Sequence, residues 1–225
     1  MRQGESGCPS EMATRFALSG IAWSEYSQAK WDIRRMLDDL GHDVESSVFT
    51  FCDFNHKGRE INLEGLLRAD EEHNVVAVKR AYYAVQNVVS VFDGTLSRVA
   101  DTGFGTKDAT LTTYEYRKED GRRAFVFWQH AETIERQDKE EGTIGHGGCG
   151  FYNKRPGDSF ETRPAVFRDA GGVPLADPVW VDLLTGRVYA FPRENVVTSA
   201  GVVRYLDVPV YDSPCLLMER SIVLP

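Results

Sequence analysis

One carboxylate near the start of the chain stands in a frame that favours a sharp turn. The stretch RQGESGCPSE, residues 2–11, places Glu5 between Gly4 and Gly7, and a second carboxylate, Glu11, follows closely. Glycine adopts backbone conformations that other residues avoid, and a positioned Glu is a common nucleophile or proton carrier. Glu is also usually a solvated surface residue. Glu5 is therefore either a functional carboxylate or an exposed acid beside a chain end.

The four cysteines do not have the spacing of a metal site or a disulfide framework. Cys8, Cys52, Cys149 and Cys215 are widely scattered, and no two of them form a C-x-x-C pair. A structural zinc site usually shows paired ligands at short spacing. The stretch HGGCG, residues 146–150, has one His and one Cys, and we interpret it as a glycine-rich loop. We expect free or buried thiols, no metal and no cofactor.

The first element that must position these groups is a helix over residues 24–41. Its apolar residues recur at three- and four-residue steps and share one face: Ala29, Ile33, Met36, Leu37 and Leu40. Most of its charged residues are expected on the opposite face: Lys30, Asp32, Arg34, Arg35 and Asp38. Ser24 is a suitable N-cap and Gly41 a suitable residue after the last turn.

A strand and a second helix follow. SSVFTFCDF, residues 46–54, is apolar at consecutive positions, which predicts a strand that is buried on both faces, as in parallel sheets covered by helices. Residues 74–94 predict a helix with Asn74 as its cap and Gly94 at its end. Residues 24–94 therefore have the alternation of an α/β protein. One strand makes no sheet, so we expect the chain to begin within a domain.

The pattern changes from about residue 108. Residues 109–117 and 123–130 predict a hairpin around Asp120-Gly121, and DLLTGRV predicts a second hairpin tip at Thr185-Gly186. Further short strands are predicted over residues 161–169, 177–192, 202–212 and 215–224. This pattern is typical of an antiparallel β-sandwich. We therefore expect an α/β part over residues 1–94, a linker over 95–107 and an all-β sandwich over 108–225.

Several motifs in this order resemble the last quarter of a clan-A glycoside hydrolase (β/α)8 barrel. They are QGESG.PSE, SQAKWDIRRMLDDLG, SSVFTFCDF, GLLR and KRAYYAVQNVVSVFD, and they cover roughly residues 2–93. For residues 108–225 the resemblance is only architectural, since a β-sandwich commonly follows such barrels. The resemblance implies that residues 1–94 are the terminal αβα segment of an incomplete TIM barrel.

The resemblance assigns Glu5 to the nucleophile at the end of barrel strand seven. A retaining glycosidase holds two carboxyl groups about 5–5.5 Å apart, one as nucleophile and the other as acid and base. In the family the acid/base Glu lies on strand four, and no residue of this chain matches it. We therefore expect a C-terminal fragment of a retaining β-glycoside hydrolase that is inactive alone.

Four further residues are candidates for substrate binding on the catalytic face of such a barrel. Asp53, Asn55 and His56 follow the predicted strand and either hydrogen-bond sugar hydroxyls or cap the loop. Trp23 either stacks on a sugar ring or packs in the loop. The same two alternatives hold for the aromatic residues of the sandwich: Tyr114, Tyr116, Trp128, Trp180, Tyr189 and Tyr205.

The charge and composition of the chain limit the classes of partner that it can have. The net charge of −8 and pI near 5.2 argue against nucleic acid and against an anionic membrane surface. No apolar run approaches the roughly 20 residues that cross a bilayer. The expected partners are a carbohydrate substrate and the missing N-terminal barrel portion.

Apolar surface around Val48, Phe49 and Phe51 and along the helices predicts self-association. The alternative is a non-catalytic carbohydrate-binding or structural β-sandwich module.

Overall fold

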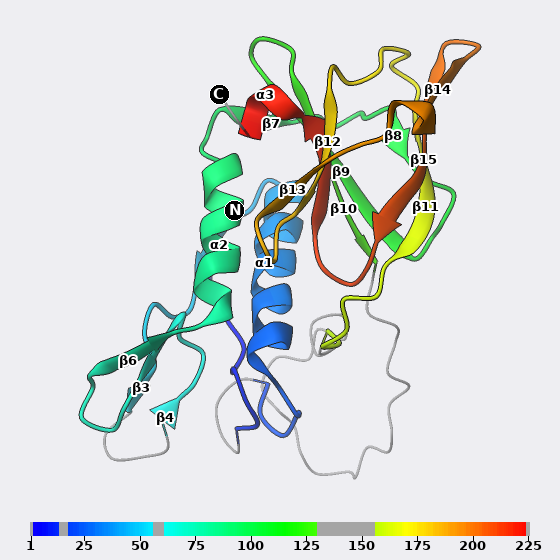
Figure 1. Cartoon of the computed structure of the whole chain (residues 1–225). Coiled ribbons are helices and arrows are strands. Elements are labelled where there is room, and N and C mark those ends of the chain that lie inside the picture. The colour runs from blue at the N-terminus through cyan, green and yellow to red at the C-terminus, as the bar shows by residue number, and fades with distance from the viewer. Residues whose placement is uncertain (1, 14–17, 56–60, 130–155, 224–225) are drawn as a thin grey trace, which may run out of the picture.

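The computed structural model describes residues 2–13, 18–55, 61–129 and 156–223. Within them the chain forms three layers, which are a pair of helices, a six-stranded sheet and a four-stranded sheet (Figure 1). The helices are α1 (Glu25–Gly41) and α2 (Arg80–Val91). The six-stranded antiparallel sheet has the order β13 (Arg187–Ala190), β12 (Pro178–Asp182), β16 (Cys215–Glu219), β10 (Arg123–Gln129), β9 (Leu111–Lys118) and β7 (Leu96–Arg98). The four-stranded antiparallel sheet has the order β14 (Val196–Ser199), β15 (Val202–Val210), β11 (Arg163–Asp169) and β8 (Phe104–Gly105).

Three pairs of short strands belong to the first part of the chain. The parallel pair is β1 (Arg2–Ser6) with β2 (Glu45–Val48). The antiparallel pairs are β3 (Phe54–Asn55) with β4 (Ile61–Asn62), and β5 (Leu67–Ala69) with β6 (Val75–Val78). No sheet closes into a barrel within the described residues. Two single turns complete the fold, the 3-10 turn η1 (Arg193–Asn195) and the helical turn α3 (Arg220–Val223).

The central strands of the six-stranded sheet are buried on both faces. In β10, Ala124, Val126 and Trp128 belong to the core shared with the helices, while Phe125 and Phe127 belong to the core shared with the four-stranded sheet. This division follows from the two-residue repeat of a strand. Double burial, which the sequence predicts for residues 46–54, is therefore a property of residues 123–129.

The apolar faces of both helices pack against this sheet. Ala29, Ile33 and Leu37 of α1 share one buried cluster with α2 and the sheet. Gly41 is required by this contact, because a Cβ atom there would lie 2.3 Å from the ring of Tyr114. The expectation that the helix stripes are exposed is thus wrong, since the sheet covers them.

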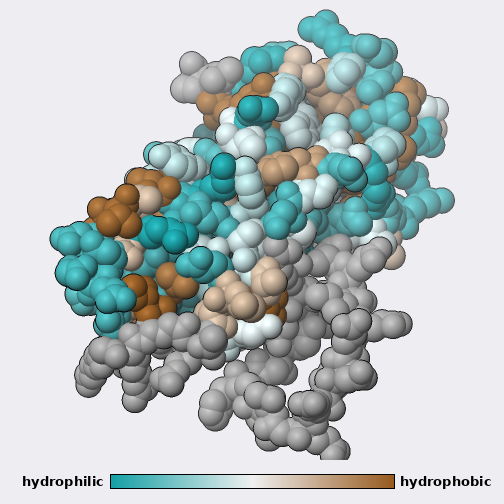
Figure 2. Space-filling model, turned by 60° about the horizontal axis from the view of Figure 1, so that its bottom comes forward, coloured by the Kyte–Doolittle hydropathy of each residue, from teal (hydrophilic) through white to brown (hydrophobic). Residues whose placement is uncertain are grey.

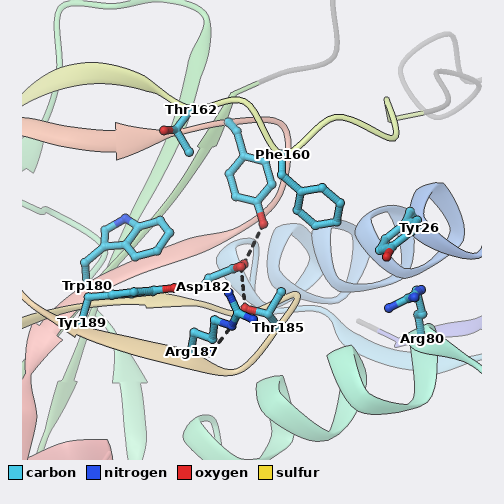
Figure 3. A pocket seen from close by; sticks show the side chains of 10 residues that line it. Tyr26, Arg80, Phe160, Thr162, Trp180, Asp182, Thr185, Arg187 and Tyr189 are labelled. Carbon is cyan, nitrogen blue, oxygen red and sulfur yellow. Dashed lines mark hydrogen bonds between the residues drawn. The ribbon is translucent and has the colours of Figure 1, made fainter.

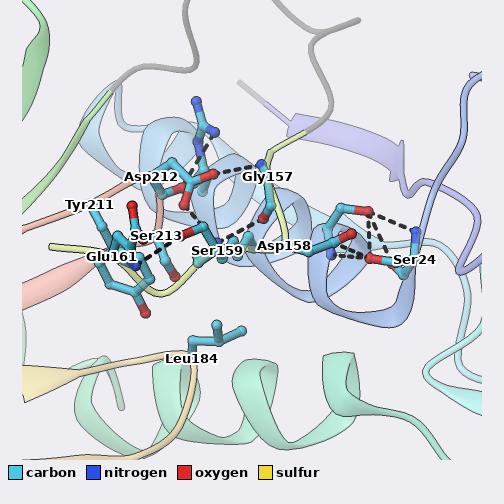
Figure 4. A network of polar contacts seen from close by, with 12 residues as sticks. Ser24, Gly157, Asp158, Ser159, Glu161, Leu184, Tyr211, Asp212 and Ser213 are labelled. Carbon is cyan, nitrogen blue, oxygen red and sulfur yellow. Dashed lines mark hydrogen bonds and ion pairs between the residues drawn. The ribbon is translucent and has the colours of Figure 1, made fainter.

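The start of α1 is as predicted, but its polar face is not. Ser24 caps the helix in a capping box with Ser27. Lys30 is buried rather than solvated, and its Nζ donates to Asp212 Oδ1 at 2.7 Å and to the carbonyl oxygens of Gly157 and Ser159 (Figure 4). Lys30 therefore joins α1 to the loop after β15.

The second helix is shorter than predicted at its start. Asn74 does not cap it, because the Asn74 N–H and side-chain amide donate to Asp70 within the β5–β6 turn. Val75–Val78 forms strand β6, and the helix begins at Arg80 with Lys79 as its cap residue. Local hydrogen bonding by Asp70 thus competes with the helix, as short acidic side chains often do.

The remaining predictions of element bounds are met in part. Both hairpins form at their predicted turns, with Gly121 at φ 90° and Gly186 at φ 72°. The predicted strand 46–54 is reduced to β2 and β3. Residues 95–107, which the sequence predicts as a linker, contribute an edge strand to each large sheet, β7 and β8. One of the two buried clusters contains residues from both parts of the chain, the helices and the six-stranded sheet.

The described surface carries apolar side chains around the β5–β6 hairpin. Val75, Val76 and Val78 are 56%, 57% and 46% exposed, and Phe51 is 63% exposed. Brown patches gather on that side of the molecule in Figure 2. None of the described helices is long and apolar enough to cross a membrane.

Candidate functional site

Glu5 lies at the carboxyl end of β1. The strand pairs with β2 in parallel, with Gln3 opposite Ser46 and Ser6 opposite Val48, and the register is irregular between these pairs. Glu5 sits at this irregularity, and its side chain is exposed. Gln3 Nε2 donates to the Glu5 carbonyl at 2.6 Å. Helix α1 leads from the end of β1 to the start of β2, so Glu5 stands where a (β/α) barrel places catalytic groups.

Of the two glycines that flank Glu5, only Gly7 is required by a close contact. A Cβ atom at Gly7 would lie 1.7 Å from the carbonyl oxygen of Phe49, so only glycine allows the two segments to approach. Gly4 has open space around it and does not have a positive φ. The close approach places Phe49, just after β2, against Gly7, which is two residues after Glu5.

A second carboxyl group, Glu64, lies beside this turn, and the sequence reasoning missed it. The segment that carries it is held by backbone hydrogen bonds, from Ser10 N to Leu63 O and from Thr50 N to Glu64 O, both 3.1 Å. Glu64 is 5% exposed. Its pKa is raised to about 7, mainly by burial and to a lesser extent by the negative charge of Glu5, against the lowering effects of a hydrogen bond with Asn62 and of the charge of Lys79. The sequence signal was an acid inside the apolar run INLEGLL.

The candidate Asp53 is the acid of an internal ion pair. Lys79 Nζ donates to Asp53 Oδ1 at 2.6 Å, and neither side chain is exposed. The N–H of Gly65 donates to the same oxygen at 2.9 Å. Burial raises the pKa of Asp53 and lowers that of Lys79, and their contact opposes both shifts. The pair ties the loop after β2 to the start of α2, which fits the loop-capping alternative.

The other predicted binding residues have different surroundings. Trp23 is 5% exposed and its Nε1 donates to Leu18 O at 2.9 Å, which fits the packing alternative. Asn55 is half-buried in β3. His56 lies outside the described residues. Glu11 pairs with Arg68 at 3.5 Å on the surface.

Two polar side chains of α1, Gln28 and Asp32, are buried. Gln28 Nε2 donates to the carbonyl oxygens of Cys8 and Gly65 at 3.1 and 3.2 Å. Asp32, one turn further along the helix, is 2% exposed, and neither of its oxygens has a hydrogen-bond partner among the described residues. Burial raises the pKa of Asp32 well above its usual range, and Glu64 adds to this. Burial likewise raises the pKa of the Cys8 thiol.

The chemistry of this end is that of carboxyl groups. Glu5 is an accessible carboxylate, and Glu64 is a buried carboxyl group that retains its proton up to about neutral pH. Among the described residues no three His, Cys, Asp or Glu side chains are grouped to hold a metal ion. The thiols of Cys8, Cys52 and Cys215 are free, and the HGGCG loop with Cys149 lies outside the described residues.

The six aromatic candidates of the second part divide into two groups. Tyr116, Trp128 and Tyr205 are buried in the two cores, and the Tyr114 hydroxyl donates to Asp38 Oδ1 at 2.8 Å. These four fit the packing alternative. Trp180 and Tyr189 keep part of their surface exposed, and their ring centroids are 5.6 Å apart.

No family model and no curated protein matches the chain. Solved structures that are similar to it include two xylanases. One is the glycoside hydrolase family 30 subfamily 8 xylanase Xyn30A from Clostridium acetobutylicum, with TM-score 0.45 and 9% identity. The other is the catalytic domain of GH30 xylanase C from Talaromyces cellulolyticus, with TM-score 0.46 and 12% identity.

Each of these two likenesses covers 96% of this chain. The chain spans only 41% and 40% of the two xylanase chains, about two fifths of their length. Both TM-scores lie below 0.5, a level at which two chains need not share a fold.

Proposed function

We propose that Glu5 is the nucleophile of a retaining β-glycosidase and that residues 1–94 are the last part of its (β/α)8 barrel. The observation that carries this proposal is the exposed position of Glu5 at the carboxyl end of β1, parallel to β2 and followed by α1. Parallel strands joined by a helix are the barrel repeat, and its catalytic groups follow the strands.

In the proposed reaction, a Glu5 oxygen attacks the anomeric carbon as the glycosidic C–O bond breaks. A second carboxyl group gives a proton to the leaving oxygen and later takes one from the water that releases the sugar. Glu64 is a poor candidate for this second group because it is 5% exposed. We assign that role to the missing N-terminal barrel portion and expect the chain alone to be inactive on ordinary glycosides.

Asn55 remains a proposed contact to substrate hydroxyls, since it follows β2 in the chain. His56 is proposed for the same role from its position in the sequence and lies outside the described residues. For Trp23 and Asp53 the internal contacts favour a structural role over substrate binding. In α1, Gln28 and Asp32 have buried polar atoms without a hydrogen-bond partner among the described residues. Because buried polar groups nearly always have partners, these atoms support the proposal that a further structural element packs against α1.

The leaving group tests this proposal. Dinitrophenolate leaves as a stable anion and needs no proton, whereas an alkoxide does. We expect the chain to release dinitrophenolate slowly from 2,4-dinitrophenyl β-glucoside or β-xyloside, and to leave methyl β-glycosides intact. Glu5→Gln should abolish the release and Glu11→Gln should preserve it. Release that persists in Glu5→Gln, or turnover of methyl glycosides, would contradict the proposal.

The second candidate is a non-catalytic carbohydrate-binding module. The observation that favours it is the partial exposure of the paired rings of Trp180 and Tyr189, in a part of the chain whose other aromatic candidates are internally engaged. Binding of an oligosaccharide that is lost in Tyr189→Ala and unaffected in Glu5→Gln would favour this candidate over the first.

A further inference from the structure

A pocket lies where the first turns of both helices meet the β12–β13 hairpin. Its volume is about 450 Å³, within the roughly 300–1,000 Å³ of small-ligand sites. Five aromatic side chains contribute to its lining (Figure 3): Tyr26, Phe160, Trp180, Tyr189 and Tyr211. The pocket lies at the start of both helices, and the first of them, α1, follows β1 in the chain.

The guanidinium groups of two arginines of this pocket form no ion pair among the described residues, although the backbone N–H of Arg80 donates to Glu25 Oε2 at 3.4 Å. Arg80 and Arg187 line it from α2 and β13, and neither forms an ion pair within residues 2–55, 61–129 and 156–223 that the structure describes. The Arg80 Cζ lies 4.0 Å from the centre of the Tyr26 ring. Stacking uses the flat face of a guanidinium and leaves its in-plane N–H groups for a bidentate anion. Arg80 is thus held in place with its donors available.

The one acid that lines the pocket is already engaged. Asp182 is buried, and its Oδ1 accepts from the Tyr211 hydroxyl at 2.7 Å and from Leu184 N at 3.1 Å. Its Oδ2 accepts from the Thr185 hydroxyl at 2.6 Å. Asp182 therefore fixes the hairpin tip and pairs with neither arginine. On a chain of net charge −8, this pocket is a local site for an anion.

The aromatic walls are suited to a ring-shaped ligand. Trp180 is fixed by the hydrogen bond from its Nε1 to Pro209 O at 3.0 Å, and Tyr189 beside it is 48% exposed. On the other side, the rings of Tyr26 and Phe160 meet edge to face with centroids 5.0 Å apart, and Phe160 is 45% exposed. Aromatic faces offer broad apolar contact, and a few placed polar groups then set the orientation of a ligand.

We propose that this pocket binds an anionic sugar unit, a pyranose ring that carries a carboxylate or a sulfate group. The ring would lie against the aromatic walls, and the anion would accept hydrogen bonds from Arg80 and Arg187. The proposal requires no chemistry from Glu5. It deepens the binding-module alternative and, if Glu5 is the nucleophile, adds a separate contact to the ligand.

Isothermal titration with three oligosaccharides of similar length tests this proposal. The probes are tetragalacturonate for the carboxylate, a κ-carrageenan tetrasaccharide for the sulfate and cellotetraose as the neutral ring. We expect at least one anionic probe to bind more tightly than cellotetraose, with an affinity that falls as salt rises. The comparison of the two anionic probes identifies the acidic group.

Substitutions then locate the binding. Arg80→Gln and Arg187→Gln should each weaken the preferred anionic probe about tenfold or more, because a charged hydrogen bond is lost. Tyr189→Ala should also weaken it. The matched control is Arg204→Gln, an equal charge change at an exposed position of β15, and it should have no effect. Circular dichroism and thermal melting verify that each variant is folded.

Three results would overturn the proposal. The first is that neither anionic probe binds the folded chain. The second is that binding is unaffected by both pocket substitutions, or weakens as much in Arg204→Gln. The third is that cellotetraose binds as tightly as the anionic probes with no dependence on Arg80 or Arg187. That third result would retain a neutral carbohydrate-binding module and reject the anionic ligand, and it would leave the role of Glu5 to its own test.

Discussion

The two parts of the chain differ in how well they satisfy their buried polar atoms. Among the described residues nine buried side-chain atoms lack a hydrogen-bond partner, and only two lie beyond residue 94, the Tyr116 hydroxyl and Ser213 Oγ. The other seven are Ser10 Oγ, Gln28 Oε1, Asp32 Oδ1 and Oδ2, Asp53 Oδ2, Asn55 Oδ1 and Glu64 Oε1. Buried polar groups nearly always have partners, and among the described residues the first part leaves more of them without one than the second part does.

The apolar surfaces show the same contrast. The strand β10 is covered on one face by the helices and on the other by the four-stranded sheet. The strand β2 has no fully buried residue, and Phe51 just after it is 63% exposed. The two helices thus cover one face of the large sheet. In addition, α1 carries buried polar atoms, in Gln28 and Asp32, that have no partner among the described residues. This difference supports the proposal that a further structural element packs against residues 1–55.

The largest effect is expected for the ion pair that holds the first part together. Lys79→Met leaves Asp53 as a buried carboxylate without its cation and should lower the free energy of unfolding by about 3–5 kcal/mol. The matched control is the double variant Asp53→Asn with Lys79→Met, which removes both charges and should lose less. Urea unfolding measures both. Equal stability of Lys79→Met and the parent chain would show that the pair is not desolvated.

Glu64 provides a pH-dependent test of the same region. Its pKa is about 7 when folded, above the value of 4.5 for an ordinary Glu, so between these values the unfolded chain releases a proton that the folded chain keeps. Stability should therefore fall as pH rises from about 4.5 to 7. Glu64→Gln should match the parent at pH 4 and exceed it by about 3 kcal/mol at pH 8. A constant difference across this range would contradict the assigned shift.

A smaller loss is expected where α1 meets the six-stranded sheet. Gly41→Ala improves helix propensity but places a methyl group against the Tyr114 ring. Overpacking of this kind costs about 1–3 kcal/mol, which thermal or urea unfolding would detect. Gln86→Ala, at an exposed position of α2, should change stability by less than about 0.5 kcal/mol. A stabilised Gly41→Ala variant would contradict the close contact.

The smallest effect on stability is expected at Phe51. Because this side chain is already exposed, Phe51→Ser should change the free energy of unfolding by less than about 0.5 kcal/mol. It should instead reduce self-association of the chain, measured by light scattering across a concentration series. Val197→Ser, an exposed substitution on the four-stranded sheet, should not. A parent chain that is monomeric at every concentration would reject self-association.

Local signals in the sequence predicted local structure well. The cap at Ser24 and the turns at Gly121 and Gly186 depend on residues a few positions apart, and all three form. The sequence did not predict the burial of Lys30, because its partner Asp212 lies 182 residues away. It also did not predict that the large sheet covers the apolar face of α1, since the three- and four-residue repeat identifies an apolar face and not its partner.

The candidate site was predicted in part for the same reason. The position of Glu5 at a strand end was implied by the family resemblance, and an exposed acid beside a chain end was the stated alternative to a functional carboxylate. Glu64 was missed because its closeness to Glu5 depends on the contact between Gly7 and Phe49, which no spacing reveals. Asp53 was a binding candidate by position, and its partner Lys79 became visible only in three dimensions.

The role of Glu5 is tested most directly by trapping a covalent sugar on it. A 2,4-dinitrophenyl 2-deoxy-2-fluoro-β-glycoside needs no proton donor, and the fluorine slows loss of the sugar by destabilising the oxocarbenium-like transition state. We predict that mass spectrometry finds the fluorosugar on the peptide that contains Glu5, that Glu11→Gln is labelled equally, and that Glu5→Gln is not labelled. A folded chain that carries the label on Glu64 or another carboxylate, or on none, would contradict the assignment of Glu5 as nucleophile.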